Sequence, residues 1–180
     1  MTALITLADI RTFKAISSSL NALKLDSEIN EAQEFDLRPF LGDEFYLALI
    51  SDFAASPSLA TYSDLFNGST YTYGSRTYQH DGLKAVLCYY AYARYLNNSN
   101  TNATAFGTVI KQNDDSEPIS EKTLARLVGQ AISGAKVFEN RVLDFLSRNN
   151  ANYPLWRISC SNVNNNKTGG LRISAVRKDK

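Results

Sequence analysis

The side chains that most often carry catalysis or bind metals are sparse in this sequence. It has one histidine, His80, and two cysteines, Cys88 and Cys160. These three do not follow the Cys-x-x-Cys or His-x-x-x-His spacings that supply the ligands of a zinc site. Cys88 also lies within an apolar run, where burial would raise the pKa of its thiol and suppress its reactivity. We therefore expect no metal, no cofactor and no catalytic centre.

His80 precedes Asp81 and an apolar segment, which is typical of a turn and helix cap. An enzyme that pairs His80 with neighbouring carboxylates is the alternative, and a concave pocket around His80 would favour it. Elsewhere, Asp43 and Glu44 stand where a helix is expected to begin, and the acidic run 114–117 stands in a loop. We interpret both acidic groups as helix-capping or solvated residues, because the first begins a helix and the second lies in a loop before one. The run 114–117 also lacks the ordered spacing and glycine of a calcium loop.

Tyrosine and threonine alternate around glycines in residues 67–79, and this alternation predicts a small β-hairpin. Tyr71, Tyr73 and Tyr78 could stack on bases or on a sugar, with Arg76 beside them to contact phosphate. Alternatively, the same pattern arises when a hairpin has one packed and one exposed face. We favour this second interpretation.

Charge is divided unevenly along the chain. The 180 residues are 44% hydrophobic and 21% charged, which is typical of a folded protein. The net charge is +1, but residues 1–156 hold 13 Lys or Arg against 17 Asp or Glu, whereas residues 157–180 hold 6 against 1. An acidic body argues against duplex DNA binding as the main role. The start resembles no secretion signal and no apolar run reaches about 18 residues, so we expect a soluble intracellular protein without membrane contact.

Apolar spacing divides residues 6–53 into short helices. One is expected within residues 6–25, beginning at Thr6, and another from Ser27, with Ala32 and Phe35 or Asp36 on its apolar stripe. Pro39 should kink or break that second helix before it restarts over residues 42–53.

Two longer helices are expected in the second half of the body. Residues 83–96 are apolar nearly all round and should be buried, and the longest helix should run from Ser120 to about residue 148. The expected core comprises Leu83, Val86, Leu87, Tyr90, Leu124, Leu127, Val128, Ala131, Phe138, Val142 and Phe145. The sequence therefore predicts a mainly α fold, a bundle of about four to five helices with a small β-hairpin.

Residues 157–180 form a basic C-terminal extension of the helical body, residues 1–156. Two stretches of alternating polar and apolar residues, 157–163 and 171–177, could pair as a hairpin in this extended tail. Tyr153 and Trp156 are suited to anchoring the point where the tail leaves the body. The tail residues expected to dock on a portal or neighbouring subunit are Arg157, Leu171, Arg172, Ile173, Arg177 and Lys178. The alternative is an unbound basic terminus.

Five segments follow one another in a recognisable order: 32–43 (AQEFDLRPFLGD), 67–73 (NGSTYTY), 82–95 (GLKAVLCYYAYARY), 104–107 (TAFG) and 153–156 (YPLW). Together, over about residues 4–156, they resemble the head-tail connector, or adaptor, proteins of tailed bacteriophages, especially those of Bacteroidetes hosts. The order and spacing of the segments carry the resemblance.

The resemblance implies a non-enzymatic, mostly helical subunit that forms a ring, usually of twelve copies, beneath the portal vertex of the filled capsid. Double-stranded DNA would pass through the lumen without sequence-specific binding. The implied partners are further copies of the chain, the portal protein, and a stopper or tail protein. The implied location is the neck of the virion, after synthesis in the host cytoplasm. Connectors commonly grip the portal with a terminal extension, and here residues 157–180 are the candidate.

Two alternatives remain open. Another neck or tail-completion protein is the first, although those tend to be β-rich barrels and this chain is mainly helical in pattern. A small nucleic-acid-binding module is the second, but it would need its basic residues on a folded surface. Here the basic excess lies in the last 24 residues.

Overall fold

The computed structural model describes residues 2–17, 20, 23–55, 59–104, 107–110 and 118–156, with the backbone alone at 23–24, 102–104 and 107–110. The helical segments are α1 (Leu7–Phe13), α2 (Leu23–Ala32), the π-helical turn η1 (Gln33–Leu37), α3 (Arg38–Leu41), α4 (Asp43–Ala54), α5 (Ala60–Asn67), α6 (Gly82–Asn98), α7 (Glu121–Arg148) and the 3-10 turn η2 (Asn150–Asn152). The strands are β1 (Ser69–Tyr73), β2 (Arg76–His80), β3 (Thr101–Thr104) and β4 (Gly107–Ile110).

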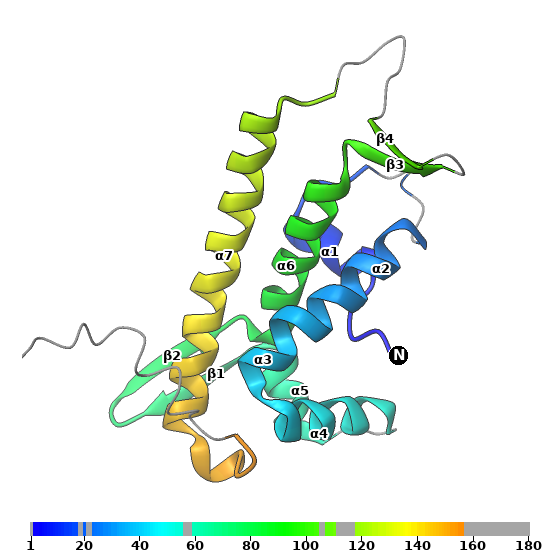
Figure 1. The fold of residues 1–180 in the computed structure, drawn as a ribbon. Helices are drawn as coiled ribbons and strands as arrows, with labels where there is room; N and C mark the ends of the chain where they lie inside the picture. Colours follow the sequence, from blue (N-terminus) through cyan, green and yellow to red (C-terminus); the bar gives the residue numbers. More distant parts are fainter. Residues whose placement is uncertain are drawn as a thin grey trace, which may run out of the picture.

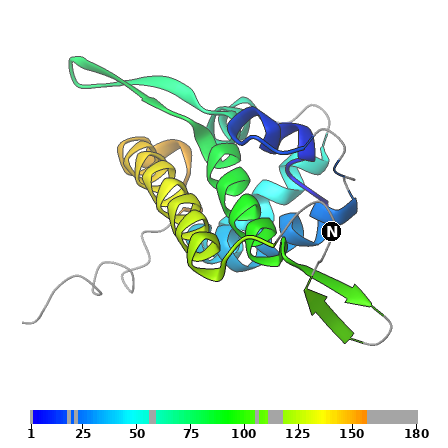
Figure 2. The ribbon, with the colours of Figure 1, turned by 90° about the horizontal axis from the view of Figure 1, so that it is seen from above.

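The α6 helix is the centre of the fold. Its segment is apolar on nearly every side, and Leu83, Val86 and Leu87 are fully buried, as predicted. The α7 helix packs along one side of α6 and α2 along another, while α1 and α5 also contact it (Figures 1 and 2). The mainly α prediction is therefore confirmed. In the described part of the chain, α2, η1 and α3 form one continuous helix. The other helices are α1, α4, α5, α6 and α7, and the short α5 is the one beyond the predicted four to five.

The apolar stripe of α7 is longer than the part of α7 that the helical body buries. Ala131, Val142 and Phe145 are buried as predicted, whereas the three apolar residues of its first turns and Phe138 are only half-buried. These partly exposed members of the predicted core are Leu124, Leu127, Val128 and Phe138. The start of α7 extends past the end of α6 (Figure 1), so the prediction of full burial was wrong for the residues near that end.

The π-helical turn η1 changes which residues face the core. The backbone N–H of Arg38 donates to the carbonyl of Gln33, five residues earlier, so one extra residue is accommodated in the turn. Gln33 and Leu37 are fully buried as a result, and Phe35 is 64% exposed. The prediction that Phe35 could lie on the buried stripe was wrong. Pro39 does not break the helix either, since the chain continues from the π-helical turn into α3, which ends at Leu41.

The predicted hairpin is present as antiparallel β1 and β2, in which Tyr71 pairs with Tyr78 and Tyr73 with Arg76. Figure 2 shows it projecting from the helical body. At its base, Gly68 and Gly82 both have positive φ, and a Cβ on either glycine would overlap the backbone of the opposite segment. The segments that enter and leave the hairpin therefore pack backbone against backbone at these two glycines, and we call this contact the crossing of Gly68 and Gly82.

Two features were not predicted. The α5 helix is short and has no side-chain cap, and its Thr, Tyr and Ser residues give a weak helical signal. The strands β3 and β4 pair antiparallel, with Thr101 opposite Ile110. Within the described ranges, no helix combines the length and the apolar character that crossing a bilayer requires.

Candidate functional site

The tail residues expected to dock on a partner, Arg157, Leu171, Arg172, Ile173, Arg177 and Lys178, lie outside the described residues. The two expected anchors, Tyr153 and Trp156, are both buried. The Tyr153 ring packs against Phe145 at a centroid distance of 5.6 Å, and its hydroxyl donates to the carbonyl of Thr61 at 2.8 Å. Burial raises the pKa of Tyr153 to about 12. The described chain thus ends in a fixed position, as an anchor requires, and the anchoring role stays a prediction.

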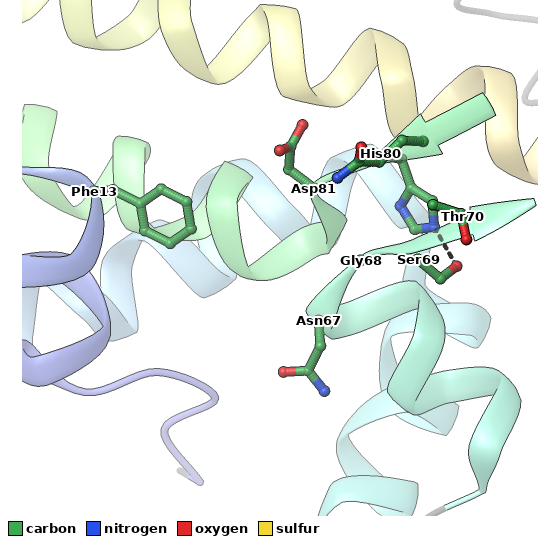
Figure 3. Close-up of a pocket in the computed structure, with 8 residues that line it drawn as sticks. Phe13, Asn67, Gly68, Ser69, Thr70, His80 and Asp81 are labelled. Atoms are coloured by element: carbon green, nitrogen blue, oxygen red, sulfur yellow. Dashed lines mark hydrogen bonds between the residues drawn. The ribbon is translucent and has the colours of Figure 1, made fainter.

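His80 is buried at the base of the hairpin. Its ring stacks on Phe145 with the centroids 4.0 Å apart, and its Nε2 lies 3.1 Å from the hydroxyl of Ser69 (Figure 3). Its Nδ1 is buried without a hydrogen-bond partner among the described residues. Burial lowers the pKa of His80, although Asp81 and Asp64 oppose that shift, so the imidazole is neutral at pH 7.

A hollow of about 270 Å³ opens beside His80 and is shown in Figure 3. It is lined by Phe13, Asn67, Gly68, Ser69, Thr70, Gln79, His80 and Asp81. The carboxylate of Asp81 accepts a hydrogen bond from Arg141 at 2.6 Å, and the ring of His80 is directed at Ser69. The Asp81 carboxylate is thus engaged by Arg141, and the His80 imidazole lies within hydrogen-bond distance of a hydroxyl. The concave pocket that would favour the enzyme alternative is present beside His80. Across the part of the chain that the structure describes, no three His, Cys, Asp or Glu side chains gather as metal ligands.

Cys88 is also buried, in the middle of α6. Burial raises the pKa of its thiol to about 12, so the reactive thiolate is not populated at neutral pH. Among the sequence candidates for chemistry, Cys160 and the acidic run 114–117 lie outside the described residues.

The tyrosines of the β1–β2 hairpin form a platform that is attached to α7. The rings of Tyr71 and Tyr78 stack with their centroids 5.6 Å apart. The guanidinium of Arg148 lies 4.1 Å from the centre of the Tyr78 ring and donates to the hydroxyl of Tyr71 at 3.0 Å. Only Tyr73, near the tip, remains 55% exposed. Because the other two rings stack on each other and contact Arg148, they are poorly placed to stack on bases.

The second exposed aromatic is Phe35, which lies on η1. The guanidinium of Arg94 lies 5.4 Å from the centre of its ring and forms ion pairs with Asp36 at 2.8 Å and with Glu31 at 3.2 Å. Three residues after Phe35, Arg38 forms ion pairs with two further carboxylates. These pairs are Arg38 with Glu34 at 2.8 Å and Arg38 with Asp43 at 2.7 Å. We call this group of seven residues, Glu31, Glu34, Phe35, Asp36, Arg38, Asp43 and Arg94, the Phe35 surface.

Sequence reasoning missed the Phe35 surface and the attachment of the hairpin to α7, for different reasons. Phe35 has the spacing of a buried residue, and only the π-helical turn moves it outward. The contact between Arg148 and Tyr71 joins residues 77 positions apart, and no local pattern reports such a pair. The alternation of tyrosines did predict the hairpin itself.

Comparison with known families gives one match. The model of a family of unknown function, DUF6712, matches residues 37–166. None of the curated proteins and none of the solved structures matches the chain.

Proposed function

The chain belongs to DUF6712, a family of unknown function, and we propose that it is a non-enzymatic structural protein of the phage neck. In this proposal, copies of the chain form a ring under the portal, join the head to the tail and let double-stranded DNA pass through the lumen. The basis is the resemblance of residues 4–156 to head-tail connectors in the order and spacing of their segments.

The observation that supports the proposal most is the projecting β1–β2 hairpin (Figure 2). Two strands are marginally stable on their own, so a hairpin extended from a helical body gains most from neighbours in an assembly. The exposed Tyr73 near its tip and the exposed Phe35 on another part of the body fit the same interpretation.

The chemistry of the described residues supports a structural role over an enzymatic one. His80 and Cys88 are buried, and the hollow beside His80 has one carboxylate, Asp81, that is already paired with Arg141. The acidic body also suits a conduit, because a lumen must pass DNA without retaining it. The portal protein and a stopper or tail protein are the proposed partners, and the neck of the virion is the proposed location.

A phage that lacks this chain tests the proposal. We expect DNA-filled heads and separate tails in the lysate, seen by electron microscopy, with infectivity restored by the full chain supplied in trans. Complete, infectious virions without the chain would contradict the proposal.

A further inference from the structure

Two exposed aromatic surfaces lie on different elements of the subunit. The β1–β2 hairpin contacts α7, which covers one side of α6, whereas η1 continues α2, which packs on another side. Figures 1 and 2 agree that the hairpin projects on the side of α7 and that α2 lies across α6 from it. A contact between two such surfaces joins copies head to tail, and a head-to-tail contact closes into a ring when its rotation permits.

The hairpin is a rigid and positively charged arm. Residues 69–80 contain no Asp or Glu. Arg76 pairs with Tyr73 across the tip and forms no ion pair within the described residues. Arg148 holds the base of the tyrosine platform, and the crossing of Gly68 and Gly82 fixes where the arm leaves the body. The arm is therefore oriented before it meets a partner, which reduces the entropy lost on binding.

The Phe35 surface has the composition of a receptor for such an arm. Its exposed apolar residue, Phe35, lies beside the guanidinium of Arg94, and ion-paired residues precede and follow it along the helix, as in an interface with an apolar centre and a polar rim. It holds four carboxylates and two guanidinium groups, so it carries net negative charge. The side chain of Glu31 is 48% exposed and that of Asp43 is 74% exposed, so both could contact an incoming arginine.

We propose that the hairpin tip of one copy docks on the Phe35 surface of the next copy. Tyr73 packs against Phe35 in this contact, and Arg76 lies near Glu31 and Asp43. Opposite charge steers the two surfaces together, and the aromatic pair stabilises the complex once it forms. The inference rests on the proposed function, because a ring needs a head-to-tail contact, and it assigns that contact to particular residues.

Cross-linking tests the contact directly, with chains that each carry one accessible cysteine and are called single-cysteine chains below. In a Cys160→Ser background, Ser75→Cys places a thiol at the hairpin turn, and Pro39→Cys places one a helical turn from Phe35. Cys88 is buried and serves as an unreactive internal control. With a short bismaleimide cross-linker, we expect covalent dimers only when the two chains are mixed, and a ladder of higher species when one chain carries both cysteines.

Substitutions of Phe35 and Tyr73 test how much the aromatic pair contributes to the affinity of the contact. Phe35→Ser or Tyr73→Ser should weaken self-association by about tenfold or more, as expected for interface anchors. Leu59→Ser is the matched control, because Leu59 is also 60% exposed but belongs to neither surface. All three changes replace exposed side chains, and circular dichroism verifies that each variant folds.

The outcomes separate this inference from the proposed function. Rings that form with Phe35→Ser and give no cross-link in the mixed sample would overturn the contact and leave the ring in place. Cross-links in each single-cysteine chain alone would show a symmetric dimer and would also overturn it. Mixed cross-links that build open chains but never a ring would support the contact and contradict the proposed neck role.

Discussion

Leu87 and Leu127 were both predicted to be core residues, but the structure buries them to different extents. Leu87 is fully buried in α6, whereas Leu127 is half-buried near the free end of α7. We expect Leu87→Ala to lower the free energy of unfolding by about 2–5 kcal/mol. Leu127→Ala should cost only about 1 kcal/mol in the isolated chain, because it removes less buried area. Urea denaturation of both variants measures the difference, and equal losses would show that α7 is covered along its whole length.

The single histidine makes folding stability dependent on pH. Burial lowers the pKa of His80 in the folded state, so below about pH 6.5 the unfolded chain binds more protons than the folded chain. Stability should therefore fall as the pH drops through this window, from pH 7 towards pH 5. His80→Gln removes the titrating group and should flatten this part of the curve while leaving assembly largely intact. Urea midpoints at a series of pH values report the effect, and an unchanged pH dependence in the variant would assign it elsewhere.

Single residues show where sequence reasoning reaches its limit. Leu83, Val86 and Leu87 were predicted to be buried because an apolar helix needs cover on every side. Phe35 was misplaced because helical spacing assumes a regular turn, and the buried Gln33 is instead held by the N-terminal segment. The backbone N–H of Leu4 donates to its Oε1 at 2.7 Å, and its Nε2 donates to the carbonyl of Thr2 at 3.2 Å. This tertiary contact leaves no periodic signal.

Two glycines in α7 provide a matched test of how closely α6 and α7 pack. A Cβ at Gly134 would overlap the ring of Tyr89, whereas a Cβ at Gly129 would meet open space. The Tyr89 ring has little freedom to move, since it packs edge-on against Phe138 with Lys14 3.9 Å from its centre. Gly134→Ala should destabilise the fold by about 1–3 kcal/mol. Gly129→Ala should stabilise it by up to about 1 kcal/mol.

Thermal denaturation of the two glycine variants is the measurement. Stabilisation by both substitutions would mean that α7 lies farther from α6 than the structure places it. Destabilisation by both would instead indicate that the open face near Gly129 is covered.

Elements were predictable to the extent that local chemistry determines them. Thr6 and Ser120 cap α1 and α7 as expected, because their hydroxyls accept from backbone donors three residues on. Ser27 does not begin a helix, since α2 already runs from Leu23. The end of α3 is set by Gly42, with φ of 81°, instead of by Pro39.

At the scale of the whole molecule, the body and the basic extension should be separable. Tyr153 and Trp156 are buried, so a chain that ends at Trp156 retains the packing of the described body. We expect this truncated chain to fold with a cooperative transition but to fail to join heads to tails. A full chain with Arg172, Arg177 and Lys178 changed to Gln should bind the portal more weakly and with less dependence on salt. Incorporation of the truncated chain into virions at the level of the full chain would contradict a docking role for residues 157–180.

The mass of the assembled chain tests most directly whether copies of this chain form a ring. Native mass spectrometry of the purified full chain, alone and mixed with its portal protein, reports how many copies associate. A ring-forming neck protein should give one discrete closed oligomer, with about twelve copies expected from the resemblance, either alone or on the portal. A chain that remains monomeric in both samples, at concentrations where the portal itself is assembled, would contradict a ring-forming neck protein.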